Sequence, residues 1–217
     1  MKRIALTALP LFGLLAACSA GVKDLDQTGN DPQLPDQSRG LLPTMGIATP
    51  RGWNGTTPTA PAGYTVTAIA HDLKIPRQML VLPNGDILVA EGTGGHEPKL
   101  RPKDIIAGFI KAKGKSTVKG GNRITLLRDS NGDGQTDLQT TFISGLDAPY
   151  GLALVGNELF VAEQGSLKKF AYTPGATSIA GPGTVVTSLP SAINHHWTKS
   201  LTASPDGTKL YVGIGSN

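Results

Sequence analysis

Three segments of the chain resemble one another in their pattern of hydrophobic and polar residues, and in the third a hydrophobic residue stands at every second position. GDILVAE (85–91), NELFVAE (157–163) and TKLYVGI (208–214) align position by position. The turn sequences PNGD (83–86) and PDGT (205–208) open the first and third units, and an apolar run lies before each turn. Alternation on both sides of a Pro- and Gly-rich turn is typical of a β-hairpin. The pattern therefore predicts a strand–turn–strand unit that occurs three times.

Strands and turns that repeat without a helical period indicate a β-propeller, in which each blade is a small antiparallel sheet. The sequence contains about two and a half such units, whereas a closed ring needs about four to eight blades. We therefore expect an all-β fold, a β-propeller of which only the first two to three blades are present, and interpret the chain as the N-terminal part of a longer protein. A complete small sandwich is the alternative, because the number of strands would also suit it.

Three further segments complete the expected β structure. The fold should begin near Gly63, where TVTAIA (65–70) alternates as a strand. Two more strands, Ile124–Arg128 and Leu138–Ile143, flank a segment rich in Asp and Gly.

A long insertion between Gly92 and Asn122 interrupts this pattern. Asp104 is placed to cap a short helix. The apolar residues expected on one face of that helix are Ile105, Ile106, Phe109 and Ile110. A long insertion in a propeller usually lies over an opening of the central channel, so a lid is one interpretation. A basic surface excursion without a role is the other.

The first 17 residues have the features of an export signal. A basic start precedes an apolar run that is too short to span a membrane. Cys18, the single cysteine, follows Leu15-Ala16-Ala17 and so resembles the lipobox of bacterial lipoproteins. The resemblance implies a lipidated Cys18 and a periplasmic or cell-surface protein anchored in the outer membrane; an ordinary signal with a chance cysteine is the alternative. Residues 18–61 would form a flexible tether to a domain at 62–217.

The charge pattern of the chain does not favour nucleic acid as a partner. The chain carries +4 overall, and no basic run is long enough to indicate nucleic-acid binding.

An Asp- and Gly-rich turn follows the strand at 124–128. Its oxygen-bearing residues alternate as they do in an EF-hand loop up to the ninth position, and Gly134 is placed for the sharp turn. The candidate calcium ligands are Asp129, Asn131, Asp133, Gln135 and Asp137. The twelfth position is Thr140 where an EF-hand has a bidentate glutamate. A tight turn between two strands, without metal, is therefore the competing interpretation.

Four segments in order carry a family resemblance. They are PRQMLVLPNGDILVAEG (76–92), RPKDIIAGFIKAKG (101–114), NRITLLRDSNGDG (122–134) and NHHWTKSLTASPDGTKLYVGIGSN (194–217). Together they resemble the sorbosone dehydrogenase family, six-bladed propellers related to the soluble quinoprotein glucose and aldose sugar dehydrogenases. The resemblance implies an oxidoreductase that uses pyrroloquinoline quinone (PQQ) and Ca²⁺ to oxidise a sugar or a related aldehyde. It also implies that the electrons leave through a quinone or cytochrome, and that this part of the chain alone is inactive.

The resemblance also implies roles for five residues. His196 precedes the turn at 205–208 and would be the general base, because histidine in its neutral form can accept a proton near neutral pH. His195 would orient it, and exposed loop histidines without chemistry are the alternative for both. Lys199 and Arg77 would bind the carboxylates of PQQ, and Trp197 would stack on the quinone or on a sugar ring. A packing or surface role is the alternative for each of these three residues.

Two functions from other classes stay open. A non-catalytic propeller at the cell surface, binding carbohydrate or a protein, would need no chemistry from the histidines. A propeller lactonase or other metal hydrolase would need a cluster of carboxylates and asparagines at the channel mouth, for which Asn194 and Glu91 are too sparse.

Overall fold

The computed structural model describes residues 30–33, 55–94, 108–110, 112–114, 120–191 and 196–215. The chain separates into two compact units, Met1–Pro50 and Arg51–Asn217. In the first unit only residues 30–33 are described, and they are exposed. Every described strand lies in the second unit.

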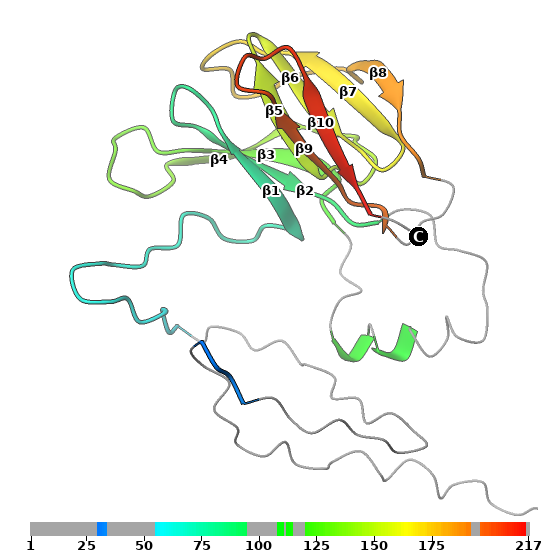
Figure 1. Ribbon diagram of the computed structural model, residues 1–217. Coiled ribbons are helices and arrows are strands. Elements are labelled where there is room, and N and C mark those ends of the chain that lie inside the picture. Colours follow the sequence, from blue (N-terminus) through cyan, green and yellow to red (C-terminus); the bar gives the residue numbers. More distant parts are fainter. Residues whose placement is uncertain are drawn as a thin grey trace, which may run out of the picture. The chain divides into compact units, whose positions relative to one another are not determined.

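The second unit contains three antiparallel sheets (Figure 1). The first sheet consists of β1 (Pro76–Val81), β2 (Ile87–Glu91), β3 (Arg123–Arg128) and β4 (Leu138–Ile143), in that order. The second repeats this order with β5 (Gly151–Val155), β6 (Glu158–Ala162), β7 (Ser166–Ala171) and β8 (Thr184–Ser188). The third sheet pairs β9 (Lys199–Ala203) with β10 (Leu210–Ile214). Two four-stranded blades and a two-stranded third sheet confirm the predicted all-β propeller, and three sheets do not fit a sandwich of two.

The three hairpins form where the repeats predict them. In the first, Gly85 has a φ of 90° and donates its amide to the carbonyl of Leu82. In the third, Gly207 has a φ of 69° and donates in the same way to Ser204. A left-handed φ is costly for residues with a Cβ, so glycine fixes each turn and with it the register of the strands.

The core lies between neighbouring sheets. The second strands β2 and β6 are apolar almost throughout instead of alternating, because each is covered on both faces. One cluster joins the first two sheets through residues such as Leu88, Phe142, Leu159 and Phe170. A second cluster joins the second sheet to the third, where Leu201 is buried. This stacking holds the inner strands β1, β5 and β9 side by side (Figure 1).

The predicted strand at 65–70 is wrong, because this segment forms no strand in the structure. Tyr64, Val66 and Ile69 are exposed there. The carbonyl of Ile69 accepts a bond from the hydroxyl of Thr136, a side chain, and so does not join a backbone ladder. Alternation alone could not make a strand without a partner edge.

Two strands of the second blade, β7 and β8, were not predicted. In the long insertion, residues 108–110 and 112–113 are helical, and the amide of Gly114 donates to the carbonyl of Ile110. This agrees with the end of the predicted helix. Asp104, Ile105 and Ile106 lie outside the described residues. Phe109 is 74% exposed, and the lid stays a prediction.

Candidate functional site

The same position at the start of each inner strand carries a large polar side chain. The inner-strand partners of the repeated valines of β2, β6 and β10 are Met79, Leu152 and Leu201. Two residues before these partners lie Arg77, Tyr150 and Lys199. Because the inner strands neighbour one another, the repeat brings these three residues to one end of the sheets.

Trp197 lies at this end of the sheets, where residues from three segments contact its ring. The guanidinium carbon of Arg77 lies 4.9 Å from the centroid of the indole. The ring of Tyr150 meets it edge-on, with centroids 6.1 Å apart and planes at 84°. Gly94 lies so close that a Cβ there would come within 2.6 Å of the indole. Residues from three different segments therefore contact one half-buried ring.

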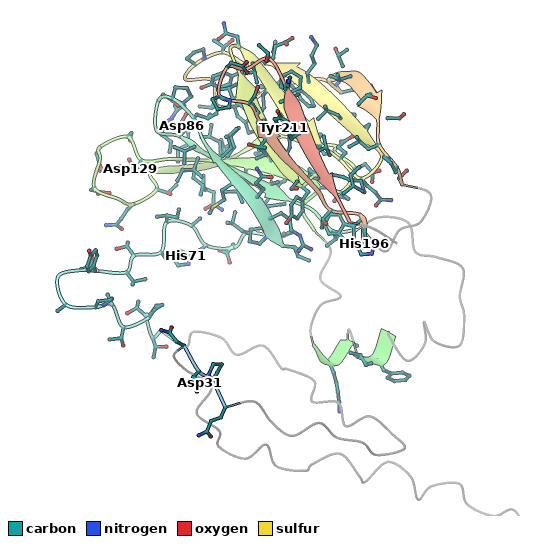
Figure 2. All side chains as sticks on the ribbon, in the orientation of Figure 1. Asp31, His71, Asp86, Asp129, His196 and Tyr211 are labelled. Atoms are coloured by element: carbon teal, nitrogen blue, oxygen red, sulfur yellow. The ribbon has the colours of Figure 1, made fainter. Side chains whose placement is uncertain are left out.

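Lys199 is turned away from solvent. Its side chain is 1% exposed, and its ammonium donates to the carbonyl of His196 at 2.7 Å. Burial lowers the pKa of this amine, because removing water disfavours the charged form. Lys199 thus ties down the loop that carries His196. The imidazole of His196 is itself exposed and lies against Gly215, where a side chain would collide with it (Figure 2).

A buried glutamate holds the loop that leads into the first inner strand. Glu91, at the end of β2, accepts bonds from the amide of Lys74 and the hydroxyl of Thr125. It also pairs with Arg123 at 2.9 Å. Burial alone would raise the pKa of Glu91, but these three donors outweigh it and the net pKa is lowered. The carboxylate therefore stays charged and fixes the entry to β1.

The second blade repeats this arrangement. Glu163 occupies the equivalent place and accepts from the amide of Asp147 at 2.9 Å and from the hydroxyl of Ser166 at 3.0 Å. Its cationic partner is Lys168, at 2.9 Å. In the third repeat, Ile214 occupies the position of these glutamates. The loop that leads into β9 is held there by Lys199, which donates to the carbonyl of His196. Two of the three entry loops are thus fixed by a carboxylate and the third by an ammonium.

The inner strands are also joined directly to one another. The side-chain amide of Gln78 on β1 donates to the carbonyl of Leu152 on β5 at 3.2 Å and to that of Leu201 on β9 at 3.1 Å. At Gly151 the backbone of β5 approaches β9 so closely that a Cβ would lie 2.6 Å from that of Leu201. These contacts fix the spacing of the three strands that carry the site.

The predicted calcium loop closes on itself. The carboxylate of Asp129 accepts from the amides of Gly132 and Gly134 at 2.7 and 2.8 Å, and Asp137 accepts from the amide of Ser130 at 2.7 Å. The side-chain oxygen of Asn131 accepts from the amide of Asp133, and the carboxylate of Asp133 accepts from the amide of Gln135. Among the described residues no group of three acidic, His or Cys side chains is arranged to hold a metal. Calcium binding here stays a prediction.

The sequence-based site residues divide into three groups. Arg77, Trp197, Lys199 and His196 come together at one end of the inner strands. Asp129–Asp137 form a separate loop, and Figure 2 shows Asp129 well away from His196. His195 and Cys18 lie outside the described residues. The loop-holding roles of Glu91 and Glu163 were missed, although the repeated VAE ending of the two segments was the available signal. The chemical roles assigned to these residues stay predictions.

The fold and this cluster define an all-β propeller with a basic and aromatic site at the end of its inner strands. A family model described as a domain of unknown function (DUF7133) matches residues 59–217. The chain therefore belongs to this family. No curated protein matches the chain.

Two solved structures are similar to the chain, and the first of them shows a shared fold. A Trichoderma reesei protein of Carbohydrate-Active Enzymes family AA12, solved in an iodide structure, matches with a TM-score of 0.52 and 18% identity, over 73% of this chain and 34% of its own. The holo form of the PQQ domain of a Coprinopsis cinerea pyranose dehydrogenase matches with a TM-score of 0.45 and 15% identity, over 68% of this chain and 29% of its own. The chain thus spans about a third of the length of each.

No helix within the described residues is long and apolar enough to cross a membrane.

Proposed function

We propose that the protein is a PQQ-dependent dehydrogenase that oxidises a sugar or a related aldehyde, of the sorbosone and aldose type. The observation that carries the proposal is the convergence of Arg77, Lys199, Trp197 and His196 at one end of the inner strands. The sequence resemblance to quinoprotein sugar dehydrogenases and a fold shared with a carbohydrate-active enzyme support it. When bound, PQQ would supply a quinone able to take a hydride from the substrate.

Arg77 fits a ligand that carries carboxylates. It is exposed, and only its Nε has a hydrogen-bond partner among the described residues, the carbonyl of Gly92 at 3.0 Å. Its terminal amino groups are therefore available for a bidentate contact with a carboxylate. Lys199 adds positive charge at the same end, although its ammonium is engaged by the carbonyl of His196.

His196 would act as the general base. Its side chain is exposed and so can reach a substrate hydroxyl, from which it would accept a proton. The contact between Lys199 and the carbonyl of His196 restrains the backbone from which the imidazole projects. A restrained base keeps its distance to the reacting proton, which is a main source of catalytic advantage.

The proposal includes the setting of the enzyme. We propose export as a lipoprotein through Cys18, anchorage in the outer membrane facing the periplasm or cell surface, and transfer of electrons to a quinone or cytochrome. Calcium bound at the 129–137 loop would be a structural ion.

The test is dye-linked oxidation of aldoses, sorbosone and other aldehydes by the full-length protein supplied with PQQ and Ca²⁺. His196→Ala should lower turnover by about 10²–10⁴-fold, the usual contribution of a general base, while PQQ still binds. His71→Ala is the matched control, because His71 is also exposed but lies on a segment away from His196 (Figure 2). A protein that neither binds PQQ nor oxidises any of these substrates would instead be a surface binding module.

A further inference from the structure

Arg77 is held in place by two contacts, and its terminal amino groups have no hydrogen-bond partner within the described part of the chain. Its Nε donates to the carbonyl of Gly92 at 3.0 Å, and its guanidinium carbon lies 4.9 Å from the centroid of the Trp197 ring. The first contact holds one edge of the guanidinium, and the second holds its central carbon over the indole ring. A guanidinium group that is already oriented loses less conformational entropy when it binds an anion.

The Trp197 ring is in turn restrained by its neighbours. Tyr150 packs against it edge-on, and Gly94 approaches so closely that any side chain at that position would displace the ring. A guanidinium already lies over the indole. The face of the ring that Arg77 covers is therefore closed to a flat ligand.

We infer that Trp197 is a positioning residue that acts on an anionic ligand through Arg77, and that it does not stack on the ligand itself. The inference rests on the proposed function in one respect, since the anion it addresses is a carboxylate of the bound quinone cofactor. Of the two interpretations that the sequence left open for Trp197, it favours packing over stacking on the ligand. Tyr150 belongs to the same support, because it holds the ring from the side.

The test is a double-mutant cycle on PQQ binding, measured by isothermal titration calorimetry with the full-length protein. Trp197→Leu removes the aromatic face and should weaken PQQ binding about tenfold when Arg77 is present, within the range of a partly desolvated cation–π contact. In an Arg77→Met background the same substitution should change the dissociation constant by less than about twofold, because nothing remains to be positioned. Trp197→Phe, which keeps an aromatic face, should recover most of the affinity.

An equal loss of affinity in both backgrounds would overturn the inference, because it would mean that Trp197 contacts the ligand directly. Tyr64→Leu is the matched control: Tyr64 is an aromatic residue of the same unit, 76% exposed, and its loss should leave PQQ binding unchanged.

A second readout separates this inference from the proposed function. If the unaltered protein does not bind PQQ, the proposed function fails, and the same four proteins are then compared by urea unfolding. Positioning predicts that the stability losses of Trp197→Leu and Arg77→Met are not additive, because each removes the same contact. Additive losses would overturn it. If Trp197→Leu does not fold, the cycle is run with Trp197→Phe, for which a smaller non-additive term is expected.

Discussion

Replacing Glu91 with glutamine should destabilise the first blade strongly. The side chain is fully buried and accepts four hydrogen bonds, from Lys74, Thr125 and two nitrogens of Arg123. Glutamine keeps one acceptor oxygen and adds an NH₂ group that would face donors. Breaking a buried ion pair costs about 3–5 kcal/mol, but Arg123 remains 28% exposed and water can reach it, so we expect about 3 kcal/mol.

The assay is urea unfolding at pH 7, followed by circular dichroism, for Glu91→Gln beside Glu158→Gln. Glu158 pairs with Lys169 at 2.5 Å, but the two side chains are 48% and 39% exposed. Water screens such a pair, so its loss should cost less than about 1 kcal/mol. If Glu91→Gln loses no more stability than Glu158→Gln, the buried glutamate does not hold the entry loop and the reasoning is refuted.

Three further predictions follow from the packing and charges. Gly151→Ala should lower the melting temperature and cost about 1–3 kcal/mol, because the added methyl group collides with β9; an unchanged melting temperature would show that the strands can separate freely. The bidentate bonds from Arg128 lower the pKa of Asp86 below its usual 3.8. The pair should therefore add stability above about pH 4, and this stability should be lost as the pH falls further. Asp86→Asn should flatten the profile of stability against pH measured between about pH 2 and 7. Calcium should raise the melting temperature, and Asp129→Asn should abolish that increase. If calcium has no effect on the unaltered protein, the Asp129–Asp137 segment is a turn that binds no metal.

The strands that the sequence predicted are those whose pattern is local. The three hairpins could be recognised because a glycine turn lies between two strand-like segments that recur along the chain, as at Gly85 and Gly207. The segment at 65–70 shows the limit, since it alternates but pairs with no strand among the residues that the structure describes. Strand β8 shows the opposite case, because all five of its residues are exposed and its position depends on pairing with β7.

The site could be predicted in composition but not in arrangement. The sequence indicated Arg77, Trp197, Lys199 and His196 as a group, yet it could not reveal that Lys199 is buried beneath a loop. That fact depends on the packing of three segments that are distant in the chain. The sequence could likewise not distinguish a tryptophan that binds a ligand from one that supports an arginine.

The long insertion leaves and rejoins the first blade at one place, where the amide of Gly120 donates to the hydroxyl of Thr93 at 3.2 Å. An insertion with adjoining ends adds little to the cost of closing the chain, since that cost grows only slowly with length. Evolution could therefore lengthen, shorten or exchange it without altering the blade beneath. Because it departs from the propeller beside Trp197, it is a natural place for relatives with the same propeller scaffold to diverge in the ligands or partners they accept.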